Sequence, residues 1–125
     1  MRMNLLRIDS AAALAAGALT ALLASVLAGW YGLPLWLLQG FAAANLLYGL
    51  YSGWVALRPP PRPLAGIVLL VVANLVWTFI CAALSLRFAH SATWLGLTHL
   101  IGEGLFVGAL ALSEWRQRRC LQTSA

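Results

Sequence analysis

Two side chains of this sequence, His99 and Glu103, have the types and the spacing to do chemistry. They lie four residues apart, so an α-helix would place them on one face, where an imidazole and a carboxyl can share a hydrogen bond or a proton. The surrounding segment carries no other charged residue from Ala92 to Ser113. An acid inside such a segment is costly to bury and is a functional-site hypothesis by default. The pair therefore predicts a protonatable or ligand-binding group.

Other apolar segments carry polar residues at matching positions. Thr20, Asn45 and Asn74 each lie near the middle of one apolar segment, as Glu103 does in the last. A lone amide or acid is expensive in hydrocarbon, so we expect these groups to meet in a bundle interior. Further polar side chains extend this set at helical spacing along the second and third segments. The candidate ligand- or proton-binding residues are Glu103, His99, Asn74, Asn45, Thr20, Thr78 and Tyr48.

Two interpretations of this polar set remain open. In the first, the groups are structural and hold the helices in one arrangement. In the second, Glu103 and His99 bind a proton or a ligand, with polar stripes leading towards each face. No second acid or base is expected to complete a relay, because Asp9 is predicted to cap the first helix and Glu114 to form a surface pair with Arg118.

The sequence predicts no catalytic site, no metal site and no cofactor. Ser85, Cys81 and His99 are the only candidates for a nucleophile with a base, and their spacing does not bring them together. The two cysteines, Cys81 and Cys120, form no CxxC or His–Cys metal spacing. We therefore expect a protein that is not an enzyme.

The composition indicates the elements that position these residues. Charged residues make up 9% of the 125 residues, and apolar residues make up 62%. An average soluble domain has about 25% charged residues, and a domain this small must keep much of its surface in water. The composition excludes a soluble globular domain and a disordered chain. An integral membrane protein remains.

The distribution of charge and proline divides the chain into four segments. Residues 10–57 carry no charge, which is long enough for two crossings separated by the Gly- and Pro-containing stretch 29–34. The proline-rich stretch 58–63 cannot be helical, and a polar turn follows the third segment. The prediction is an all-α integral membrane four-helix bundle with short loops. It forms a single domain, residues 1–125, with helices at about 10–29, 35–57, 64–86 and 92–115.

The arginines predict the orientation. With four crossings, all except Arg87 fall on the side that holds both termini and the proline-rich loop. Positive residues favour the cytoplasm, so both termini are expected inside a multi-pass protein of the inner (plasma) membrane. The net charge of +5 comes from these helix flanks, so it does not indicate nucleic-acid binding.

Small residues at a spacing of four predict the packing faces. Inside a bilayer, such residues let helix backbones approach closely. The first segment has more of them than one neighbour would use, so beyond the lipid bilayer we expect a homo-oligomer or another membrane protein as partner. The predicted helix-packing residues are Gly17, Ala21, Gly49, Gly53, Gly104 and Gly108.

Two functions follow from these features. The favoured one is a non-enzymatic structural or accessory subunit that acts through its small-residue faces. The alternative is a small proton-coupled transporter or ligand-binding membrane protein that uses Glu103 with His99 at the membrane midplane. The chain resembles small multidrug transporters in length, but those carry an essential acid in the first helix, where none is expected here. It also resembles dual-topology fluoride channels in size, which the arginine bias argues against.

Overall fold

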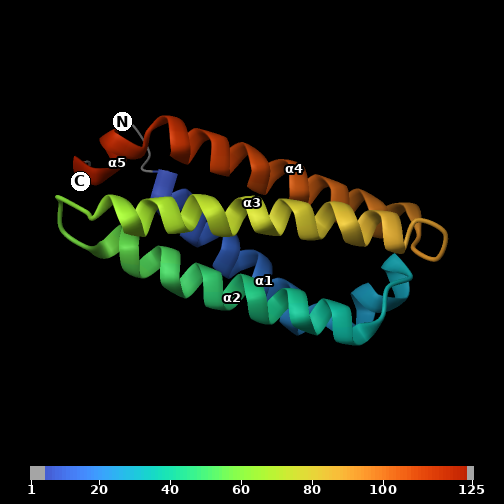
Figure 1. Ribbon diagram of the computed structural model, residues 1–125. Helices are drawn as coiled ribbons and strands as arrows, with labels where there is room; N and C mark the ends of the chain where they lie inside the picture. Colours follow the sequence, from blue (N-terminus) through green and yellow to red (C-terminus); the bar gives the residue numbers. More distant parts are fainter. Residues whose placement is uncertain (1–4, 124–125) are drawn as a thin grey trace.

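The computed structural model describes residues 5–123, and these residues are almost entirely helical (Figure 1). No strand occurs in this part of the chain, which confirms the all-helical prediction. The helices are α1 (Leu5–Tyr31), α2 (Leu35–Leu57), α3 (Leu64–Arg87), α4 (Trp94–Arg116) and the short α5 (Arg118–Thr123). Arg2, which the orientation prediction also used, lies outside the described residues.

The first helix begins earlier than the sequence suggested. α1 starts at Leu5, so Asp9 lies within the helix and is only 2% exposed. The prediction that Asp9 caps the helix is therefore wrong. The physical reason is that Leu6, fully buried against Ile67 and Leu70 at the same end of the molecule, extends the apolar packing of α1 beyond the acid. The other long helices begin and end within two residues of the expected positions.

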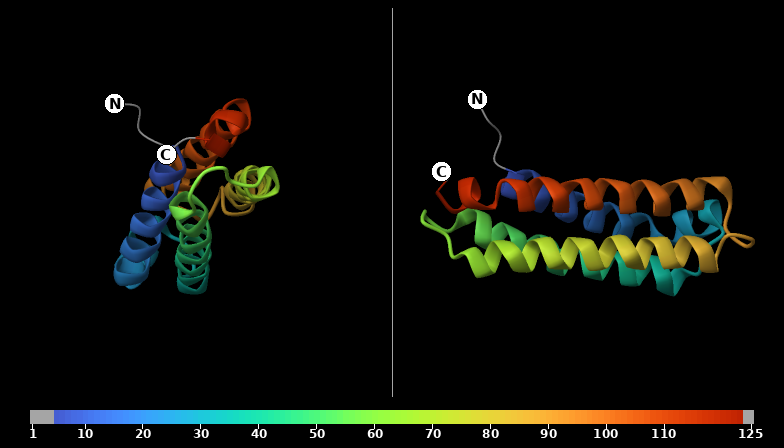
Figure 2. Two further views of the ribbon diagram at one scale, coloured as in Figure 1. Left: turned by 90° about the vertical axis from the view of Figure 1, so that its left-hand side faces the viewer. Right: turned by 45° about the horizontal axis from the view of Figure 1, so that its top comes forward.

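The four long helices form two helical hairpins. α1 packs tightly along α2, and α3 packs along α4, whereas α2 and α3 touch only sparsely. The views in Figure 2 show all four long helices running roughly side by side. The described ends of the chain and the loop 58–63 lie at one end of the molecule, and the loops 32–34 and 88–93 lie at the other (Figure 1). Gly32, with φ of +64°, makes the sharp turn of the first hairpin.

Glycines make the close approach within the first hairpin. A Cβ added at Gly17 would lie 3.0 Å from the backbone nitrogen of Leu46, and one at Gly49 would lie 3.0 Å from that of Leu14. At Gly53, an added Cβ would meet the Ser10 hydroxyl at 2.8 Å. These three predicted packing residues thus lie between α1 and α2. Ala21, predicted with them, is exposed and does not take part.

The second hairpin uses the two remaining predicted glycines. An added Cβ at Gly104 would lie 3.2 Å from the Cβ of Cys81, and one at Gly108 would lie 3.4 Å from the hydroxyl of Thr78. Both glycines therefore let α4 approach α3. The glycine pairs predicted on α2 and α4 are accordingly used within the chain, between the helices of each hairpin.

Arg62, in the loop between α2 and α3, connects α2 to α5. Its guanidinium donates hydrogen bonds to the carbonyls of Val55 and Ala56 in α2 and of Leu121 in α5. Burial lowers the pKa of Arg62, and the nearby positive charge of Arg7 lowers it further. Leu121 of α5 packs in the apolar cluster at the same end of the molecule, together with Leu6 and Ile67.

Three of the described helices, α1, α3 and α4, are long and apolar enough to cross a membrane. Large apolar side chains point outward along the molecule; Leu22 and Leu86, for example, are at least 80% exposed. An extended apolar surface of this kind suits lipid better than water. The fold is thus consistent with a membrane helical protein. α2 has 23 residues, enough to cross a membrane, but it is not among the described helices that are also apolar enough to do so.

Candidate functional site

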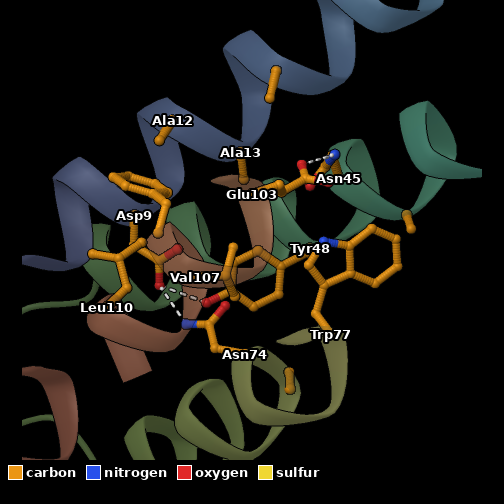
Figure 3. A pocket seen from close by; sticks show the side chains of 14 residues that line it. Asp9, Ala12, Ala13, Asn45, Tyr48, Asn74, Trp77, Glu103, Val107 and Leu110 are labelled. Atoms are coloured by element: carbon orange, nitrogen blue, oxygen red, sulfur yellow. Dashed lines mark hydrogen bonds between the residues drawn. The ribbon is translucent and has the colours of Figure 1, made fainter. Parts of the chain in front are cut away.

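A cavity of about 220 Å³ lies between the two hairpins, and all four long helices contribute to its wall (Figure 3). The polar part of the wall includes the carboxyls of Asp9 and Glu103. Small and apolar side chains complete it. The lining residues are Asp9, Ala12, Ala13, Ala16, Ala44, Asn45, Tyr48, Ala73, Asn74, Trp77, Glu103, Phe106, Val107 and Leu110.

Glu103 contacts a side chain from each of three helices. Asn45 of α2 donates a hydrogen bond from Nδ2 to Glu103 Oε1 at 3.3 Å. On the other carboxylate oxygen, His99 Nε2 lies 3.9 Å away, one turn along α4. Cys81 of α3 places its Sγ at the same distance from Oε2. The carboxyl is therefore held between the hairpins, with its side chain 13% exposed.

His99 continues the polar contacts from Glu103 towards the end of the molecule that holds loops 32–34 and 88–93. Its Nδ1 forms a hydrogen bond of 3.2 Å with the hydroxyl of Tyr31, the last residue of α1. The two rings lie 5.2 Å apart, centroid to centroid. The His99 side chain is 29% exposed, so it links the acid to a more accessible region. His99 does not line the cavity itself.

Asp9 forms a second polar centre in the same cavity. Tyr48 of α2 donates a hydrogen bond from its hydroxyl to Asp9 Oδ2. Asn74 of α3 donates to the same oxygen from Nδ2, at 3.4 Å. Figure 3 shows these side chains from three helices pointing toward one another. Asp9 and Asn74 are both at least 97% buried, so their hydrogen bonds are shielded from solvent.

Glu114 joins this centre from α4. Its Oε1 accepts a hydrogen bond of 2.7 Å from Asn74 Nδ2, the nitrogen that also faces Asp9. The side chain is fully buried, and its Oε2 has no hydrogen-bond partner among residues 5–123. The predicted surface pair is therefore wrong. Arg118 instead donates to the carbonyl of Trp115 and lies over the Trp115 ring, 4.1 Å from its centroid.

The three acidic side chains of the chain thus all lie in or directly beside one cavity. This corrects two expectations, that no second acid accompanies Glu103 and that the first helix carries none. Both missed acids had a signal in the sequence. Asp9 precedes Ala13 and Gly17 at a constant spacing of four, and Glu114 lies eleven residues, three helical turns, after Glu103.

The remaining predicted residues divide into two groups. Asn45, Asn74, Tyr48 and Glu103 line the cavity together. Thr20 is buried but does not line it. Thr78 lies between α3 and α4, and its hydroxyl contacts the backbone carbonyls of Asn74 and Gly104 at 3.0 and 3.3 Å. Of the polar groups near the helix midpoints, Asn45 and Glu103 therefore belong to one centre and Asn74 to the other. Thr20 belongs to neither.

Aromatic side chains form part of the cavity wall beside the acids. Trp77 lies one turn after Asn74 on α3, and its ring packs against Phe41 at a tilt of 58°, with centroids 4.9 Å apart. Its indole Nε1 is buried without a hydrogen-bond partner in the described part of the chain. Phe106 of α4 and Tyr48 add two more rings. The depth of the polar residues along the helices does not identify Trp77. Its position in the cavity wall follows only from the packing of α3.

Within the described residues, no group of three or more His, Cys, Asp or Glu side chains converges as a metal site would require. The chemistry that this wall offers is therefore hydrogen bonding, proton exchange and charge recognition. Comparisons with protein-family models, with curated proteins and with solved structures found no match to this chain.

The shared amide of Asn74 provides a test of the Asp9 centre. We expect Asn74→Leu to lower the free energy of unfolding by about 1–3 kcal/mol, because two buried carboxyls lose their common donor. Asn45→Leu is the matched control. It removes one partly exposed hydrogen bond and should cost about 1 kcal/mol or less. Thermal unfolding of the purified full chain, followed by tryptophan fluorescence, measures both. An equal or larger loss for Asn45→Leu would contradict the assignment.

Proposed function

We propose that all four long helices cross the inner (plasma) membrane as a four-helix bundle with both termini in the cytoplasm. α2 has 23 residues, which span about 34 Å at the helical rise, enough for a hydrocarbon core of about 30 Å. Asn45 and Tyr48 of α2 line the cavity, so these polar side chains face the interior of the bundle and not the lipid. Every arginine among residues 5–123 except Arg87 belongs to the end that carries loop 58–63 and α5, as the positive-inside rule requires.

Cysteine labelling from one side of the membrane tests this topology. Cys120 and His90 are both exposed and belong to opposite ends of the molecule. In intact cells, a membrane-impermeant maleimide should label a His90→Cys, Cys120→Ser double variant, whereas the wild-type chain should react only after permeabilisation. Cys81 is buried and should stay silent in both. Labelling of wild-type Cys120 in intact cells would contradict the proposed orientation.

Within this bundle, the function that the geometry supports best is binding of a small ligand coupled to proton exchange, as in a small carrier. The observation that carries it is the cavity itself, with Asp9 on the first hairpin and Glu103 on the second. A bundle that needed polar groups only for packing would gain nothing from leaving a cavity beside them, because voids weaken a core. Intramembrane acids facing a cavity are characteristic of substrate and proton pathways.

The arrangement of the hairpins suits such a cycle. Each hairpin is closely packed internally. Between the hairpins, the contact of α2 with α3 is sparse, and α1 meets α4 where Gly96 lies against Tyr31. A ligand that bridges Asp9 and Glu103 would therefore change the contact between two units that each stay intact. Glu103 would exchange its proton through His99 and Tyr31 on the outer side.

A structural or accessory subunit is the second candidate, and one surface favours it. α1 exposes a stripe of small residues that no helix of the chain covers: Ala18, Ala21, Ser25 and Gly29. Such a stripe suits close approach by a helix of a second copy or of another membrane protein. Neither candidate is an enzyme. They differ at Glu103, which the subunit needs only as a hydrogen-bond acceptor and the carrier needs as an acid.

A matched pair of cavity variants tests ligand binding. Ala44 lines the cavity, whereas its neighbour Ala43 is exposed. The probes are phenyltrimethylammonium, benzyl alcohol and benzoate, a cation, a neutral molecule and an anion of similar size. At least one should raise the unfolding temperature of the wild type and of Ala43→Leu, because a ligand stabilises the state that it binds. Ala44→Leu, which fills the cavity, should abolish the shift. No shift with any probe would overturn the proposal.

A further inference from the structure

The charge of the cavity wall is one-sided. Of the fourteen lining residues, two are carboxylic acids and none is Arg, Lys or His. Glu114 adds a third carboxyl one hydrogen bond away, through Asn74. His99, 3.9 Å from Glu103, is the one basic side chain described in contact with any of these acids. Neutralising the site therefore requires protons or a positively charged ligand.

The neighbouring polar side chains supply only neutral dipoles. The amide of Asn45 donates to Glu103, and the hydroxyl of Tyr48 and the amide of Asn74 donate to Asp9. Such donors stabilise a carboxylate but leave its charge in surroundings of low polarity. A cation between Asp9 and Glu103 would contribute the charge pairing that the wall lacks.

The rest of the wall distinguishes an organic cation from a metal ion. Trp77, Tyr48 and Phe106 present aromatic rings to the cavity, and aromatic rings attract organic cations through their π faces. A metal ion would instead need converging ligands, and none of the described His, Cys, Asp or Glu side chains forms a group of three. The volume also fits, since an apolar cavity of roughly 150 Å³ holds benzene and this one measures about 220 Å³.

We propose that the cavity between the hairpins binds a small organic monocation, such as an aromatic or alkylated amine, between Asp9 and Glu103. This inference rests on the proposed ligand-binding function and specifies its ligand. Protons compete with the cation for the same two carboxyls. The groups that face Asp9 are Tyr48, Asn74 and Glu114, and those that face Glu103 are Asn45, Cys81 and His99.

The test is calorimetric binding of phenyltrimethylammonium, benzyl alcohol and benzoate to the full chain in nanodiscs of zwitterionic lipid. The wild type should bind the cation most tightly, and its affinity should rise with pH as the carboxyls lose protons. Asp9→Asn and Glu103→Gln should each weaken cation binding about tenfold, the loss of one charge-assisted contact. Both variants should also flatten the pH dependence.

The outcomes separate the two proposals. Tighter binding of benzoate or benzyl alcohol than of the cation would overturn the organic-cation inference and leave ligand binding intact. Absence of binding by all three probes would overturn both. The probe order and the pH dependence are measured on the wild type, so they decide the matter even where a variant fails to fold. Unchanged cation affinity in both variants, with an intact fold, would also overturn the inference.

Discussion

Burial of carboxyl groups among apolar helices is the constraint on which the rest of this structure depends. The three acids of the chain, Asp9, Glu103 and Glu114, all lie in or beside one cavity, where an unpaired charge is expensive. Each is held by a neutral side chain from another helix, so the acids fix how the helices meet. Asn74 is central, because one nitrogen serves carboxyls from α1 and α4. The same arrangement that satisfies the acids keeps two of them facing a space large enough for a ligand.

The packing of the helices explains why the space survives. Gly17 and Gly49 draw α1 onto α2, and Gly104 draws α4 onto α3, so each hairpin is closely packed within itself. Between the hairpins, Gly96 of α4 lies directly against the backbone of Tyr31 at the end of α1, whereas α2 and α3 touch only sparsely. Close packing within each hairpin and sparse contact between α2 and α3 leave the cavity where the polar side chains converge. At the end that carries loop 58–63, Arg62 connects α2 to α5 through hydrogen bonds to their backbone carbonyls.

The sequence predicted the helical class well and the site in part. Charge-free runs and proline placed the helices because these signals are local. Depth along the helices groups Thr20, Asn45, Asn74 and Glu103, and the structure brings all of these except Thr20 to one cavity, together with Tyr48. Asp9 and Glu114 were assigned to helix ends, because a local rule, an acid near a helix start or a pair at spacing four, explained each of them. Their burial is a tertiary effect: Leu6 extends α1 past Asp9, and Asn74 draws Glu114 inward.

Infrared difference spectroscopy of the carboxyl C=O stretch tests the central claim most directly, that Glu103 is an exchangeable acid facing a ligand cavity. The full chain in lipid would be compared with Glu103→Gln between about pH 5 and pH 9, a window around the pH at which a working acid or base must change state. The account predicts a carboxyl band that titrates within this window and is absent from the variant. A Glu103 band that stays protonated throughout would contradict it, because a sealed hydrogen bond would leave the acid with a purely structural role.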